Sequence, residues 1–409
     1  MSGSDAALAA LARGDADMLA RIAAARRAAP GDPQLVLAQA EAEVRLDVPD
    51  AGEGLAAILR QSPGWVEGQR QLASIRWERG EGEAALSGFV EALKADPANG
   101  GLWNGYIATL AACEMPGRAA DSAAEARAAG FADPILLLIE AGHAGKAGEA
   151  DRVARLLAEV PAAVPGRLAI EARHHLQVGD PAAAAPLLDQ ARAEAPGDVA
   201  MWALTELTWR ALGDPRGEWL AGQIGLTSAK QIDLDDRLEP LLRSLHGTRH
   251  QPLGQSVRGG TQTRGRLFDR AEPEFARLKA ALQSAVDAFV SELPPLDPAH
   301  PLLRHRARPI RVDGGWSVRL APGGHHSSHV HAAGILSSAC YIALPSLDAE
   351  AQEGWIELGR PPDDLKLAIG PRTAIEPKRG RLVLFPSYLY HGTRPFARGE
   401  RLTVAFDAA

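Results

Sequence analysis

A histidine cluster carries the strongest chemical signal in this sequence of 409 residues. Four of its twelve histidines fall within residues 325–331, and two of them, His329 and His331, are separated by one residue. Side chains two residues apart on an extended strand point to the same face, so these two imidazoles can approach one ion. Imidazole is a ligand for iron, zinc, copper and nickel. The spacing therefore predicts a metal site.

A third ligand is expected from a distant part of the chain. His391 follows an apolar run at residues 381–385 that has the length of a strand. If the strands of one domain lie side by side, His391 can reach a metal held by His329 and His331. We therefore predict that all three histidines bind the same ion.

An arginine near the third histidine indicates what the metal site binds. Arg401 stands ten residues after His391, and on an extended strand it shares a face with Thr403. A guanidinium group binds a carboxylate through two parallel hydrogen bonds, so it is the expected anchor for a dicarboxylate beside a metal. Iron with such an anchor predicts 2-oxoglutarate as a cosubstrate, bound by Arg401 and Thr403.

Short apolar runs bounded by glycine and proline must position these residues. Such runs are typical of strands, and without helices between them they predict a sandwich or open barrel, whose mouth can hold a metal. A helix at residues 272–293 precedes them, because apolar residues recur there at spacings of three and four. The predicted strands are 316–320, 336–344, 354–358, 381–385 and 402–406.

The first half of the chain is rich in alanine, with leucine at helical spacing. Turn-forming segments recur through it, and the steps between Pro30, Pro63, Pro97 and Phe131 are 33, 34 and 34 residues. A period of this length predicts stacked helical hairpins, and the pattern resembles the tetratricopeptide repeat family. A solenoid of this kind has a concave face that could bind a peptide.

From about residue 251 onwards, the sequence resembles a bacterial group of 2-oxoglutarate/iron(II) oxygenases. In this group the oxygenase domain often follows tetratricopeptide repeats in the same chain. Each motif alone is weak, but together they are specific. The motifs are Gln255 to Thr263, His329-Val330-His331, Leu336 to Pro345, Gly380 to Ser387 with His391, and Glu400 to Thr403.

The repeats and the resemblance together predict a two-domain α plus β protein. Residues 1–214 are expected to form a tetratricopeptide-like helical solenoid, residues 215–254 a helical linker, and residues 255–409 the oxygenase domain. The resemblance implies that this last domain is a double-stranded β-helix (jelly-roll, cupin-like). It also implies that iron(II), 2-oxoglutarate and O₂ take part, with succinate and CO₂ formed as a substrate is hydroxylated.

The ligand set departs from the wider superfamily in one position. Most members bind iron with two histidines and a carboxylate, whereas this chain has His331 where the carboxylate is expected. Two interpretations stay open. Either His329, His331 and His391 all bind the iron, or His329 and His391 alone do so, as in the reduced site of aspartyl/asparaginyl β-hydroxylases.

A glycine-containing segment at residues 255–263 precedes the predicted helix. Paired glycines permit unusual backbone angles, so this segment could be a lid over the site or a tight turn at the domain junction. Arg258 and Gln262 are its candidate substrate-contacting residues.

Three functions are compatible with these features. The first is an oxygenase that hydroxylates a side chain of a protein or peptide held by the repeats. The second is a small-molecule oxygenase whose repeats mediate docking or a homo-oligomer, and the third is a catalytically silent scaffold. Arg401 favours the first two, because a scaffold needs no carboxylate anchor beside a metal.

Composition and net charge limit the classes of partner that the protein is expected to bind. A net charge of −7 and a pI near 6.0 argue against nucleic acid, whose phosphates are bound mainly by an excess of lysine and arginine. Two cysteines that fall in different predicted domains make a disulfide framework improbable. No basic and apolar leader and no membrane-length apolar stretch is recognised, so we expect a cytoplasmic protein without a membrane partner.

Overall fold

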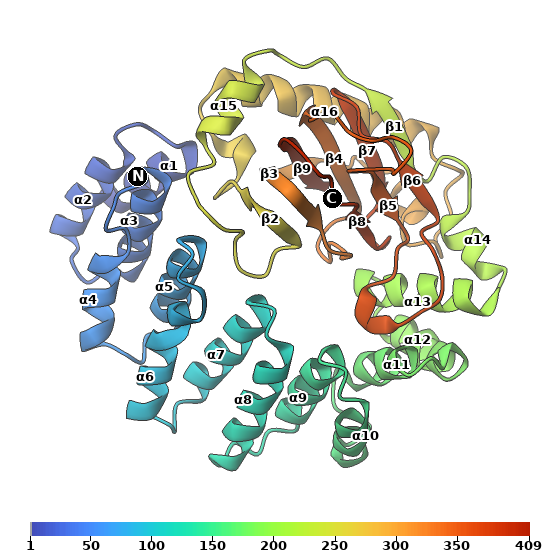
Figure 1. The fold of residues 1–409 in the computed structure, drawn as a ribbon, viewed down its shortest axis with the longest axis horizontal. Helices are drawn as coiled ribbons and strands as arrows, with labels where there is room; N and C mark the ends of the chain where they lie inside the picture. Colours follow the sequence, from blue (N-terminus) through green and yellow to red (C-terminus); the bar gives the residue numbers. More distant parts are fainter. Residues whose placement is uncertain (1) are drawn as a thin grey trace.

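The computed structural model describes residues 2–409, and it begins with an arc of antiparallel helices (Figure 1). The predicted helical repeats are confirmed. The helices of the arc are α1 (Gly3–Arg13), α2 (Met18–Ala28), α3 (Pro33–Arg45), α4 (Glu53–Gln61), α5 (Val66–Glu78), α6 (Ser87–Ala95), α7 (Gly100–Ala112), α8 (Pro116–Ala128), α9 (Pro134–Lys146), α10 (Ala150–Glu159), α11 (Arg167–Gln177), α12 (Pro181–Glu194) and α13 (Val199–Leu212).

Polar caps explain why the helices begin where the sequence period places them. The side chains of Asp32, Asn99, Asp133 and Asp198 accept hydrogen bonds from the first free backbone N–H groups of α3, α7, α9 and α13. An aspartate or asparagine at this position satisfies donors that have no partner inside the helix. The caps are 67, 34 and 65 residues apart, close to one or two repeat lengths, so each marks the first helix of a hairpin.

The C-terminal domain is built on antiparallel strands, and all of the predicted strands occur. Among residues 2–409 a six-stranded sheet has the order β1-β7-β4-β9-β3-β2 and a three-stranded sheet the order β6-β5-β8. Apart from β1, these strands are β2 (Val257–Gln262), β3 (Val312–His326), β4 (Leu336–Ala343), β5 (Ile356–Leu358), β6 (Thr373–Ile375), β7 (Arg381–Pro386), β8 (His391–Thr393) and β9 (Arg401–Ala408). The predicted fold class is therefore confirmed.

Helix α16 (Pro273–Glu292) lies behind the sheet in Figure 1 and matches the predicted helix closely. Its apolar stripe, which includes Phe275, Leu282 and Phe289, is fully buried in the same core as the strands. Helical spacing of apolar residues on one face produces this packing.

The segment expected to be a helical linker is only partly helical. Helices α14 (Arg216–Ala221) and α15 (Leu238–Ser244) flank strand β1 (Ser228–Gln231), which pairs with β7 at the edge of the large sheet. The strand sequence Ser-Ala-Lys-Gln is polar, and half of its residues are exposed. It is stabilised by backbone pairing with β7, so side-chain patterning could not reveal it.

Residues 255–263 also differ from both alternatives considered for them. Val257–Gln262 form β2, which is hydrogen-bonded to β3 along most of its length. Gly259 and Gly260 lie at a bulge in this pairing, and a side chain at Gly260 would collide with the backbone of Arg319. The glycines therefore allow two strands to approach, and the segment is neither a free lid nor a simple turn.

The end of the arc packs directly against the β domain. One continuous core extends from Ala172 in α11 to Ala408 in β9. Arg372 of the β domain also forms an ion pair with Glu206 of α13, which is 1% exposed. The predicted boundary near residue 214 lies inside this shared core, so α11 to α13 are attached to the β domain by buried contacts.

The beginning of the arc returns to the β domain and closes a ring (Figure 1). Arg264, just after β2, donates two hydrogen bonds of 2.9 and 2.6 Å to Glu78 of α5 and pairs also with Glu41 of α3. The Glu78 side chain is only 2% exposed. Burial raises the pKa of Glu78, and Arg264 opposes that shift by stabilising the carboxylate.

No helix within residues 2–409 is long and apolar enough to cross a membrane.

Removing the ring-closing arginine should destabilise the protein strongly. Arg264→Ala leaves the buried Glu78 carboxylate without its cation, whereas Glu41 keeps its ion pair with Arg45, and the loss costs about 3–5 kcal/mol of the free energy of unfolding. The loss of stability should be smaller at pH 5 than at pH 8, because protonation of the unpaired carboxylate removes its negative charge. The measurement is urea unfolding at both pH values. Arg266→Ala is the matched control, because it removes an exposed ion pair with Asp313 and should change stability by less than about 1 kcal/mol. Equal effects of the two variants would contradict this account.

Candidate active site

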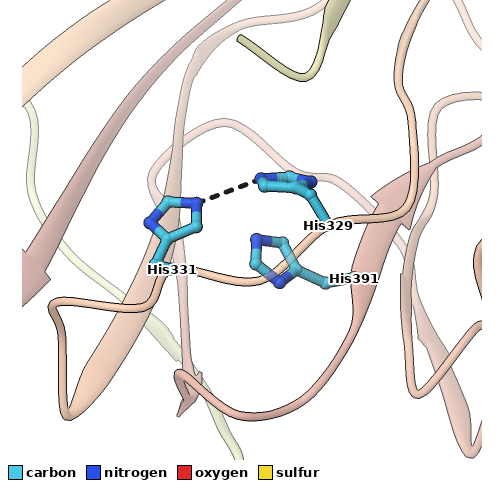
Figure 2. A group of neighbouring side chains, drawn as sticks. All are labelled: His329, His331 and His391. Carbon is cyan, nitrogen blue, oxygen red and sulfur yellow. Dashed lines mark hydrogen bonds between the residues drawn. The ribbon is translucent and has the colours of Figure 1, made fainter. Parts of the chain in front are cut away.

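The three predicted histidines converge on one point in the β domain (Figure 2). His329 and His331 lie on the segment that follows β3, and His391 begins β8. The backbones of His329 and His391 form an antiparallel bridge with two hydrogen bonds of 3.0 Å. One nitrogen from each of the three rings lies within 4.8 Å of the other two.

Hydrogen bonds orient the three rings. The Nδ1 atom of His329 lies 2.8 Å from the Ser327 carbonyl oxygen, and that of His391 lies 3.0 Å from the Leu389 carbonyl oxygen. The Nδ1 atom of His331 lies 2.6 Å from the Asp407 carboxylate. These acceptors assign the proton of each neutral imidazole to Nδ1, which leaves the lone pair on Nε2.

The arrangement of the three Nε2 atoms fits a metal ion. The Nε2 atoms of His329 and His331 lie 3.0 Å apart (Figure 2), and two lone pairs at this distance repel unless a proton or a cation lies between them. Burial lowers the pKa of His329 to about 4 and that of His391 well below its ordinary value, so both stay neutral near pH 7. Neutral imidazoles that converge in this way are the donors a transition metal requires.

A cavity of about 600 Å³ extends from these histidines, and both parts of the molecule line it. The β domain contributes the three histidines, Tyr341, Arg401 and Thr403, while the solenoid contributes Ala111, Ala112 and Glu114. The ring closure therefore forms part of the cavity wall.

Arg401 is the most unusual residue in the cavity. It is 1% exposed, and its guanidinium group donates only to the Gly354 carbonyl at 3.0 Å and to Thr393 Oγ1 at 3.2 Å. Its Nε atom has no hydrogen-bond partner, and no carboxylate within residues 2–409 forms an ion pair with it. A buried cation without a counter-ion is costly, so this geometry favours an anionic ligand.

Tyr341 lies beside Arg401 and was not singled out as a binding residue by the sequence. It is paired in register with Thr403 on the neighbouring strand, and its ring centre lies 6.0 Å from the Arg401 guanidinium carbon. Its hydroxyl is buried without a partner in the described chain. Burial raises the pKa of Tyr341 to about 12, so the hydroxyl keeps its proton and can donate it in a hydrogen bond. A tyrosine within the apolar end of β4, between Cys340 and Ile342, was the available signal.

The two candidate substrate-contacting residues also reach the cavity. Arg258 and Gln262 both line it. Arg258 forms an ion pair with Glu114, which lies in the connection between α7 and α8. It therefore joins the β domain to the solenoid at the cavity wall.

Two polar residues that contact the histidines were missed by the sequence. Asp407 contacts His331, and Ser256 Oγ lies 3.1 Å from His329 Nε2 and 2.9 Å from His326 Nδ1. Asp407 carries no local motif, and Ser256 lies in the motif from Gln255 to Thr263 without a role having been assigned to it. Both are brought to the histidines by pairing between strands or segments distant in the sequence.

Comparison with known proteins finds a family match within the β domain. Residues 314–407 match the family described as "Putative 2OG-Fe(II) oxygenase". This range contains all five predicted metal and cosubstrate residues. The C-terminal part of the chain is therefore similar to 2-oxoglutarate/iron(II) oxygenases over these residues. Iron(II) and 2-oxoglutarate are the cofactors of that family, as the sequence predicted.

Solved structures similar to the chain include representatives of both parts. A tetratricopeptide repeat protein from Parabacteroides merdae is 16% identical, with 53% of this chain and 87% of that chain covered and a TM-score of 0.38. A prolyl-4-hydroxylase from Pseudomonas putida is 17% identical, with 48% and 97% covered and a TM-score of 0.30. A 2OG-Fe(II) oxygenase family protein from Burkholderia pseudomallei is 10% identical, with 37% and 85% covered and a TM-score of 0.22. No curated protein matches the sequence.

Proposed function

We propose that this protein is an iron(II)- and 2-oxoglutarate-dependent oxygenase that hydroxylates a side chain of a protein or peptide recruited by the repeats. His329, His331 and His391 hold the iron, and Arg401 and Thr403 bind the distal carboxylate of 2-oxoglutarate. The observation that carries the proposal is a buried arginine without a counter-ion in the same cavity as three converging imidazoles.

The three histidines direct their Nε2 atoms towards the iron. Their Nδ1 atoms are occupied by fixed acceptors, so each Nε2 is oriented before the metal arrives. Iron bound there supplies the oxidation of 2-oxoglutarate by O₂ that accompanies hydroxylation of the substrate. The protein contributes orientation and the exclusion of competing reactions.

The other end of the cosubstrate meets a preformed anion site. The Arg401 fork binds the distal carboxylate, and the hydroxyls of Thr403 and Tyr341 donate additional hydrogen bonds. All three side chains are at most 5% exposed, so water is largely kept away from this end. A dicarboxylate of suitable length would neutralise Arg401 with one end and approach the histidines with the other.

A hollow on the solenoid supports a peptide substrate. It has a volume of about 750 Å³ and lies between α7 and α9, where Trp103, Ile107, Phe131 and Ile135 give it an apolar lining. Ala111 lines both this hollow and the cavity that contains the histidines. A peptide lying in the hollow could therefore extend its reacting side chain towards the iron.

Loss of the carboxylate anchor should weaken 2-oxoglutarate binding. A charge-assisted hydrogen bond contributes on the order of 1.5–3 kcal/mol, so Arg401→Ala should lower the affinity by roughly 10- to 150-fold. Arg401→Lys should recover only part of it, because lysine keeps the charge without the planar fork. The measurement is anaerobic calorimetry with iron present, and thermal unfolding checks that both variants fold. Parent-like affinity in both folded variants would exclude Arg401 as the anchor.

Blocking the solenoid hollow should separate a peptide substrate from a small molecule. Ala108 is exposed and lines the hollow, so Ala108→Trp fills it without touching the histidines or Arg401. Peptides from a cell extract are incubated with the enzyme, iron, ascorbate and 2-oxoglutarate, and mass spectrometry then searches for products heavier by one oxygen atom.

We expect Ala108→Trp to lower the yield of hydroxylated peptide roughly tenfold or more, the effect of losing about 1.4 kcal/mol of binding. Its affinity for 2-oxoglutarate should stay unchanged. Ala129→Trp is the matched control, because Ala129 is exposed and lines neither the solenoid hollow nor the cavity that contains the histidines. A small-molecule product whose formation is indifferent to Ala108→Trp would refute the peptide proposal and leave the oxygenase assignment intact.

A further inference from the structure

His331 is held differently from the other two histidines. The Nδ1 atoms of His329 and His391 face neutral backbone carbonyls, whereas that of His331 faces a carboxylate oxygen of Asp407 at 2.6 Å. A hydrogen bond to a carboxylate is stronger than one to a carbonyl and transfers more negative charge to the ring. The three imidazoles are therefore unequal donors.

The surroundings of Asp407 direct its charge towards His331. Asp407 lies on β9 opposite Ser337 of β4, whose hydroxyl donates to the same carboxylate oxygen at 3.1 Å. Ser337 is itself 2.9 Å from the Ser387 hydroxyl. In the described part of the chain no arginine or lysine pairs with Asp407, and His331 is its only ionisable partner.

The charge of the ligand set indicates what the contact between Asp407 and His331 does. Non-haem iron(II) oxygenases commonly bind iron through two histidines and one carboxylate, a set with a charge of −1. Three neutral histidines leave the iron without that negative charge. Asp407 holds a carboxylate behind one of them, on the ring atom opposite the metal-facing nitrogen.

We infer that Asp407 is a positioning residue that acts through His331: it fixes the ring with Nε2 towards the metal and supplies, from behind the ligand, the negative charge that a carboxylate ligand would otherwise provide. This inference rests on the proposed iron site. It assigns to His331 a direct role as a ligand, and it distinguishes Asp407 from the groups that contact the other two rings.

The test is anaerobic titration of the full-length protein with iron(II), together with the iron(III)/iron(II) potential of the loaded protein. Asp407→Asn keeps the size and an acceptor oxygen but removes the charge. We expect it to lower iron(II) affinity by about 10- to 100-fold, the usual effect of losing such a contact. The potential should rise, because iron(III) loses more stabilisation than iron(II) when a nearby negative charge is removed. Asp407→Glu should restore part of both properties.

Asp313→Asn is the matched control. Asp313 lies opposite Asp407 on the adjacent strand, but its carboxylate pairs with Arg266 and not with a histidine. This variant removes one negative charge from the same region and should leave affinity and potential unchanged. Should Asp407→Asn fail to fold, Ser337→Ala removes the hydrogen bond that holds Asp407 and should shift both properties in the same direction by less.

A double-mutant comparison separates an indirect role from direct ligation by Asp407. If Asp407 acts through His331, Asp407→Asn should have no further effect on iron affinity in a His331→Ala background. Additive losses would overturn the inference, as would parent-like affinity and potential in folded Asp407→Asn. Failure of the parent protein to bind iron would instead contradict the proposed function.

Discussion

Two backbone hydrogen bonds between His329 and His391 join segments that are far apart in the sequence. They connect the chain after β3 to the start of β8, and thereby link the large sheet to the small one. The Nδ1 contacts then turn each ring so that the Nε2 atoms meet. Every later feature of the site depends on this arrangement, because the cavity, Arg401 and Asp407 are useful only if the metal donors converge.

The helical repeats contribute to the same site through ring closure. Buried ion pairs of Arg264 hold the beginning of the arc, and a shared core holds its end. The connection after α7 is thereby fixed against the β domain, where Glu114 meets Arg258 and Ala111 lines both the cavity and the solenoid hollow. The repeats are thus part of the cavity wall, and under the proposed function they also recruit the substrate.

Local patterns in the sequence predicted much of this structure. Histidine spacing, the apolar runs and the repeat period identified the converging histidines, the central strands and the solenoid, because each feature has a short-range signature. The edge strand β1 was missed because its polar residues carry no such pattern, and β2 was read as a lid or turn because its glycines serve strand packing. Tyr341, Ser256 and Asp407 gained their contacts from strand register and chain packing, which residue types alone do not encode.

Under the proposed function, iron and 2-oxoglutarate occupy one cavity in this chain. Two ligands that stabilise each other must do so reciprocally, so iron(II) should raise the affinity for 2-oxoglutarate by the same factor as 2-oxoglutarate raises the affinity for iron(II). The direct measurement is anaerobic calorimetry of each ligand with and without the other, using the parent protein and His329→Ala. We expect equal coupling factors well above one in the parent and their loss in His329→Ala. Binding of 2-oxoglutarate that is indifferent to iron, or no binding of either ligand, would contradict this expectation.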